Sequence, residues 1–110
     1  MSKHDDQVYL EHILASIQKA EKYLAGHSFD RFERDDKTID AVIRNFEIIG
    51  EACNNISDNF KESHHEIDFR PAVSMRNRLA HGYDEIDLKT VWDAVKQDLP
   101  ALRKDIETLL

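Results

Sequence analysis

The sequence predicts an all-α protein, a bundle of four or five helices, and two observations carry that prediction. Hydrophobic residues recur at three- and four-residue spacing through most of the chain, which is the periodicity of amphipathic helices. No run of alternating β-branched residues lies between turn dipeptides, so strand signals are absent. The 110 residues suffice for one domain, residues 1–110, with one modest core.

The first helix is expected from an aliphatic stripe that ends before Gly26, a plausible stop signal. After it, Ser28 can cap a short helical turn that carries Phe29 and Phe32. The residues of the first stripe are Leu10, Ile13, Leu14, Ile17 and Leu24.

A second, long helix is expected to start near Asp35 and Asp36, because acidic residues favour a helix N-terminus. Cys53 lies on its hydrophobic stripe, so we interpret this cysteine as a small core residue rather than as a nucleophile. As the only cysteine, it offers no internal disulfide and no cysteine-based zinc site, which fits a reduced setting. The stripe comprises Ile39, Val42, Ile43, Phe46, Ile49, Cys53, Ile56 and Phe60.

A polar stretch, residues 61–68, interrupts the pattern before two further helices. Pro71 suits the first turn of the third helix, and Gly82 suits its left-handed C-terminal cap. The third helix carries Ala72, Val73, Met75, Leu79 and Ala80. Pro100 should kink or split the last helix, because proline removes one hydrogen bond. That helix carries Leu88, Val91, Trp92, Val95, Leu99, Leu102, Ile106 and Leu109.

The charge balance is acidic, with 15 basic and 22 acidic residues and a formal net charge of −7. This argues against broad electrostatic adhesion to nucleic acid or membrane, but it does not exclude a local basic site. Three arginines and no acid lie between Arg70 and Arg78. No stretch approaches the ~20 apolar residues of a membrane span, and the polar N-terminus lacks the pattern of a signal peptide. We therefore expect a cytoplasmic protein with no membrane contact.

Residues 76–83, Arg-Asn-Arg-Leu-Ala-His-Gly-Tyr, gather groups suited to phosphate chemistry. Arginine holds phosphate with a fork of donors, and histidine can move protons near neutral pH. Arg76 and His81 are thus the minimum set for metal-free phosphodiester cleavage, with no cofactor expected. Their five-residue separation places them about 140° apart on a helix. Either the helix end at His81 or a second copy of the helix, related by two-fold symmetry, could complete the site.

On RNA, this set of groups suggests a specific hypothesis. One histidine would take the proton from a 2′-hydroxyl, and the 2′-oxygen would attack the adjacent phosphorus. The arginines would stabilise the negative charge that develops in the transition state. A second histidine, or water, would protonate the leaving 5′-oxygen. The products would be a 2′,3′-cyclic phosphate and a 5′-hydroxyl, and DNA should resist cleavage.

Structural interpretations of the same residues compete with the catalytic one. Arg76 and Arg78 could be solvated charges or partners for some of the acids. His81 could interact with the helix C-terminal dipole, and Tyr83 could fold back onto the helix as the hydrophobic residue of its cap.

Two further groups of carboxylates and histidines could in principle carry chemistry or bind a metal. Glu47 and Glu51 are four residues apart on one face of the long helix. We expect that one of them meets a motif arginine or is simply exposed, in preference to acid–base work or cation binding. His64, His65 and Glu66 are adjacent, so they do not share a helix face and we expect no metal site there.

The pattern R-x-x-x-x-H-x-Y at a helix end resembles the signature of the HEPN domain, and specifically of the HepT group, the toxin half of HepT–MntA toxin–antitoxin systems. Residues 36–52 resemble the long helix of that group, and residues 86–92 and 98–100 resemble its closing helix. The resemblance covers about residues 8–110. Segment 64–70 departs from it, because relatives often have His-Pro and a Trp there, which puts the docking of a partner in doubt.

This resemblance implies a homodimeric HEPN bundle with a cleft between subunits and a metal-independent ribonuclease activity. Arg76 and His81 would be the catalytic pair, Asn77 would orient the histidine or bind phosphate, and Arg78 would support phosphate binding. The partner would be an antitoxin, a nucleotidyltransferase of the MNT type that transfers AMP to Tyr83. The alternative is a non-catalytic HEPN protein that binds or regulates such a nucleotidyltransferase. The net charge favours this alternative slightly, whereas the intact motif favours the enzyme.

Overall fold

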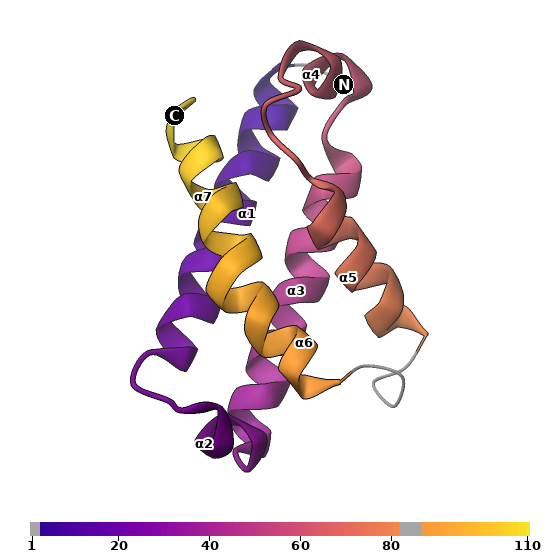
Figure 1. Cartoon of the computed structure of the whole chain (residues 1–110). Coiled ribbons are helices and arrows are strands. Elements are labelled where there is room, and N and C mark those ends of the chain that lie inside the picture. Colours follow the sequence, from indigo (N-terminus) through magenta and orange to yellow (C-terminus); the bar gives the residue numbers. More distant parts are fainter. Residues whose placement is uncertain (1–2, 82–86) are drawn as a thin grey trace.

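The two longest helices, α1 (Lys3–Leu24) and α3 (Asp36–Asn55), pack against each other along the molecule (Figure 1). The computed structural model describes residues 3–81 and 87–110. The predicted stripes of both helices are buried at this contact, which confirms their amphipathic assignment. Fully buried side chains here include Ile13, Ile17, Leu24, Val42, Phe46 and Ile49.

Cys53 belongs to this core, as the sequence predicts. Its side chain is fully buried on α3. Burial disfavours the charged thiolate and raises the pKa of the Cys53 thiol to about 12. A thiol in this environment has little thiolate with which to act as a nucleophile.

The link between α1 and α3 follows the predicted turn signals. Gly26 adopts the left-handed conformation, with φ of +79°, just after α1 ends. The hydroxyl of Ser28 accepts a hydrogen bond from the backbone N–H of Arg31, at 3.1 Å. Ser28 thereby caps the short helix α2 (Phe29–Glu33), as expected.

Asp35 caps the N-terminus of α3. Its carboxylate accepts hydrogen bonds from the backbone N–H and the hydroxyl of Thr38, at 3.2 and 2.7 Å. Its Oδ2 also lies 3.1 Å from His27 Nε2. The bonds from Thr38, and then the one from His27, lower the pKa of Asp35 to about 2. The predicted start of the long helix is therefore confirmed, with a cap that ties it to the preceding loop.

The prediction that this helix continues to Phe60 is wrong. The chain turns extended at Ile56, with φ of −64° and ψ of 135°, and Ser57 caps a separate helix, α4 (Asp58–Ser63). The buried carboxylate of Asp6 on α1 accepts hydrogen bonds from Ser57 N–H, at 2.8 Å, and from Ser57 Oγ, at 2.7 Å. A tertiary contact therefore fixes the break, and local periodicity alone does not reveal it.

Helix α5 (Arg70–Ala80) packs on α3 and begins with Pro71 in its first turn, as predicted. The last predicted helix is split ahead of Pro100, as its position implies. Helix α6 (Leu88–Asp93) passes into a π-helical turn at residues 94–98, and α7 (Leu99–Glu107) follows. These three elements form a continuous C-terminal rod, residues 88–107, which crosses α1 in Figure 1.

Trp92 joins the C-terminal rod to α2. Its ring lies 5.8 Å from that of Phe29 and 5.6 Å from that of Phe32, centroid to centroid. Trp92 therefore contributes to the core of its own chain. In the described ranges, 3–81 and 87–110, all regular structure is helical, which confirms the predicted fold class. No described helix is long and apolar enough to cross a membrane.

Candidate active site at the end of helix α5

Helix α5 presents the motif residues on two different sides. Arg76 lies toward α3, in a hollow of about 410 Å³ that Tyr9, His12 and Glu51 also line. His81 lines a separate groove of about 900 Å³ on the other side of the helix. The structure thus confirms the predicted divergence of the two side chains. One chain does not bring Arg76 and His81 together.

Arg76 is held by an ion pair with α3. Its Nη2 donates to Glu51 Oε2 at 2.9 Å, and its Nη1 approaches Asn77 Oδ1 at 3.5 Å. The prediction that Glu47 or Glu51 meets a motif arginine is confirmed for Glu51. The side chains of Glu51 and Arg76 are 59% and 35% exposed, and ion pairs this accessible contribute about 0–1 kcal/mol. An incoming phosphate therefore has only a weak competitor for this guanidinium.

Gly50 determines how closely α5 approaches α3 at Arg76. A Cβ atom at position 50 would lie 2.2 Å from Arg76 Cβ and 3.2 Å from the carbonyl oxygen of Ala72. Neither contact involves the flexible end of a side chain, so α5 itself would have to move. The glycine therefore serves packing and places the base of the Arg76 side chain.

Gly50→Ala should lower the free energy of unfolding by about 1–3 kcal/mol, because overpacking at a rigid helix contact displaces backbone. Urea unfolding followed by circular dichroism measures this loss. Glu47→Ala, at an exposed position of the same helix, is the matched control and should leave the unfolding midpoint near that of the wild type. Equal midpoints for Gly50→Ala and the wild type would contradict this account of the glycine.

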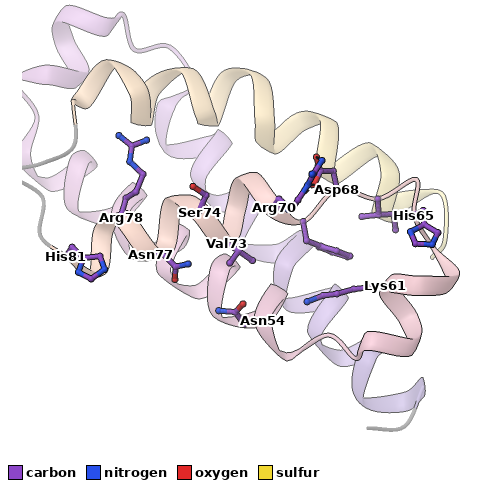
Figure 2. A pocket seen from close by; sticks show the side chains of 12 residues that line it. Asn54, Lys61, His65, Asp68, Arg70, Val73, Ser74, Asn77, Arg78 and His81 are labelled. Carbon is purple, nitrogen blue, oxygen red and sulfur yellow. Dashed lines mark hydrogen bonds and ion pairs between the residues drawn. The ribbon is translucent and has the colours of Figure 1, made fainter.

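His81 is the residue at which α5 ends. Its backbone, with φ of −90° and ψ of 1°, departs from helical angles, and its N–H donates to the Arg78 carbonyl at 3.2 Å. The side chain is exposed and faces the groove (Figure 2). The expectations for Gly82 and Tyr83 fall on residues outside the described ranges, so they stay predictions.

The groove follows α5 for its whole length. Arg78 and His81 lie at one end, whereas Lys61, His65 and Arg70 lie at the other (Figure 2). The rest of the lining, apart from Asp68, is uncharged, and it comprises Asn54, Ile67, Phe69, Val73, Ser74 and Asn77. Cationic, amide and imidazole groups therefore share one open surface, which suits a polyanionic ligand.

Asp68 is the acidic residue of this lining, and Arg70 neutralises it. Arg70 Nε donates to Asp68 Oδ1 at 2.9 Å, and Arg70 Nη2 donates to Oδ2 at 3.1 Å. These two bonds lower the pKa of Asp68, so the carboxylate stays ionised and paired. The remaining cations of the groove face no acid of the lining.

Sequence reasoning missed part of this lining. Arg70, Ser74, Asn77 and His81 recur at helical spacing, and that spacing is a signal that could have placed them on one face of α5. Lys61 and Asn54 come from other helices, so no local pattern connects them with the motif.

Of the three residues considered for a metal site, His64 and Glu66 contact each other, whereas His65 lies apart from them. His64 Nδ1 lies 3.1 Å from Glu66 Oε1, and the His64 ring stacks on Phe60 with centroids 4.4 Å apart. His65 instead lines the groove. Within the described part of the chain, no group of three potential ligands has the arrangement of a metal site.

Comparison with known proteins decides the family. A family model described as "Ribonuclease HepT-like" matches residues 13–109. The chain belongs to the HepT-like ribonuclease family. No solved structure gave a significant match.

Several full-length HepT-like relatives support this assignment. A protein of Thermococcus cleftensis named "Probable ribonuclease HepT" is 41% identical over 107 residues, which is 97% of each chain. A protein of Caldanaerobacter subterraneus subsp. tengcongensis, provisionally named an RNase, is 32% identical over 102 residues, 93% of this chain and 91% of that one. The HepT-like assignment confirms the family that the motif and its flanking blocks resemble, and the names of the relatives support ribonuclease activity.

Proposed function

We propose that this HepT-like chain is a metal-independent endoribonuclease and the toxin of a HEPN/MNT toxin–antitoxin system. The observation that carries the proposal is the open position of His81 at the end of a basic groove, beside Asn77 and Arg78. Family membership supports RNA as the substrate class. The helical fold supplies the rigid element on which these groups stand.

The proposed reaction begins when His81 accepts the proton of a 2′-hydroxyl group. The 2′-oxygen then forms a bond to the adjacent phosphorus, and the bond from phosphorus to the 5′-oxygen breaks. A protonated imidazole or water gives that oxygen its proton, which leaves a 2′,3′-cyclic phosphate and a 5′-hydroxyl. Arg78 and Asn77 bind the phosphate oxygens, and an arginine at position 76 stabilises the added charge.

The proposed active form is a homodimer, because Arg76 of one chain points away from its own His81. A two-fold axis near the end of α5 lets one subunit supply the arginine and its partner supply the histidine. The weak ion pair to Glu51 leaves the guanidinium available for this role.

The test of this function is RNA cleavage in the presence of EDTA. The wild-type chain should cleave single-stranded RNA, leave DNA of the same sequence intact and produce 2′,3′-cyclic phosphate ends, identified by mass spectrometry. Activity that needs a divalent cation, or products with 3′-hydroxyl ends, would contradict the proposed chemistry.

The proposed off-switch is Tyr83, which follows His81 by two residues. In the proposed step, the tyrosine oxygen attacks the α-phosphorus of ATP, loses its proton to solvent, and pyrophosphate leaves. The product carries a phosphodiester with roughly one negative charge close to Arg78 and His81. Such a group would occupy the cations that otherwise hold the RNA phosphate.

Incubation with the cognate MNT-type nucleotidyltransferase and ATP should therefore raise the mass of the chain in steps of AMP. Tyr83→Phe should abolish the increase, because it removes the accepting hydroxyl and little else. The matched control is Tyr23→Phe, which removes an exposed hydroxyl on α1 and should be modified like the wild type. Modification of Tyr83→Phe to the wild-type extent would mean that another residue accepts the AMP.

A further inference from the structure

The groove as a whole carries more positive charge than cleavage at one phosphate requires. Lys61, Arg70 and Arg78 are permanent cations of the lining, and Asp68 is its one carboxylate. The chain as a whole carries a formal net charge of −7, so this surface reverses the overall sign. A local reversal of this kind favours a polyanion that is longer than a single phosphate.

The dimensions of the groove also fit several nucleotides. From Arg70 to His81, α5 rises by roughly 16 Å. Successive phosphates of a strand are at least about 3.4 Å apart, the value for a stacked duplex, so an unstacked strand needs only a few phosphates to span this distance. Figure 2 shows the Lys61 side chain, at the end of the groove away from His81, directed toward Asn54.

The floor of the groove is suited to bases rather than to phosphates. Ile67 and Phe69 are buried beneath it and Val73 is half-buried. Asn54, Ser74 and Asn77 add hydrogen-bonding groups at the level of the floor. A positively charged groove with apolar side chains in its lining suits an unpaired strand, whose bases are free to leave the stack.

We propose that this groove binds single-stranded RNA along α5, with the scissile phosphate beside His81 and Arg78 and flanking phosphates at Arg70 and Lys61. The position of the scissile phosphate rests on the proposed function. The flanking contacts at Lys61 and Arg70 do not, because they concern binding alone. Asp68 weakens the strand's affinity, since its carboxylate occupies the guanidinium of Arg70.

The experiment separates binding from cleavage by its choice of probe. A fluorescent 2′-O-methyl RNA strand of about ten nucleotides lacks the attacking hydroxyl, so fluorescence anisotropy reports affinity alone. The wild type should bind this strand more tightly than a duplex of the same sequence. Lys61→Gln with Arg70→Gln should weaken binding roughly tenfold and reduce the slope of log affinity against log salt by about 1.4, because two phosphate contacts are lost.

Two further variants sharpen the result. Asp68 Oδ1 accepts a hydrogen bond from the Arg70 backbone N–H at 3.0 Å, and Asp68→Asn keeps an oxygen for it. The substitution removes the negative charge that competes with RNA for Arg70, so this variant should bind the strand more tightly. Lys104→Gln removes an exposed cation from α7, outside the groove, and should bind like the wild type.

Each contrary outcome points to one proposal. No binding of the strand, a preference for the duplex, or wild-type affinity in the Lys61 and Arg70 variant would overturn the RNA path along α5. The chain could instead bind the strand through the groove but fail to cleave unmodified RNA. That result would support the RNA path along α5 and overturn the proposed ribonuclease function.

Discussion

His81→Ala should slow RNA cleavage by about 10²–10⁴-fold, the usual contribution of a positioned general acid or base. The substitution should not disturb the fold, because the side chain is exposed and the cap of α5 uses only its backbone N–H. Initial rates on a fluorogenic RNA, measured at saturating substrate in EDTA, report the loss in kcat. Circular dichroism verifies that helix content is unchanged.

The control for this prediction is another histidine outside the groove. His64→Gln removes an imidazole that stacks on Phe60 and bonds to Glu66, and it should cleave RNA like the wild type. Undiminished cleavage by His81→Ala would remove His81 from the reaction.

The same variant separates the two candidate functions in cells. Expression of the wild type, but not of His81→Ala, should arrest growth with loss of RNA. If neither protein affects RNA while both bind a nucleotidyltransferase, the non-catalytic alternative holds. The formal net charge of −7 is the observation that favours that alternative.

The elements of the fold were predictable where the signals are local. Ser28 and Asp35 cap the helices that follow them, and Pro100 lies just after the π-helical turn of the last helix. The end of α3 was not predictable, because Ile56 and Phe60 continue its hydrophobic spacing. At the break, Ser57 donates its hydrogen bonds to the carboxylate of Asp6, which lies 51 residues earlier in the chain.

Some features of the candidate site were likewise predictable from local signals, and others were not. The different sides of α5 on which Arg76 and His81 lie follow from helix geometry. The roles of Gly50 and Lys61 depend on how α3, α4 and α5 pack, which no periodicity within one helix specifies. Helix spacing can therefore indicate the direction of a side chain but not what lies opposite it.

Arg76→Ala should reduce cleavage by about 10²–10³-fold, the usual effect of losing one group that stabilises transition-state charge. The loss should appear in kcat, since Arg76 lies outside the groove that holds the strand in its own subunit. Arg44→Ala, which removes an exposed arginine from α3, is the matched control and should retain full activity.

Mixed dimers then show which subunit supplies the arginine. If Arg76 of one subunit acts with His81 of its partner, a dimer of one Arg76→Ala chain and one His81→Ala chain has one intact site. Co-refolding equal amounts of the two inactive proteins gives such dimers in about half of the population, and so about a quarter of wild-type activity. If the pair acts within one subunit, every mixed dimer lacks an intact site. Activity that stays at the level of the separate variants would therefore contradict the shared site. In that case Arg76 and His81 would have to act on one phosphate from different sides of the same helix α5.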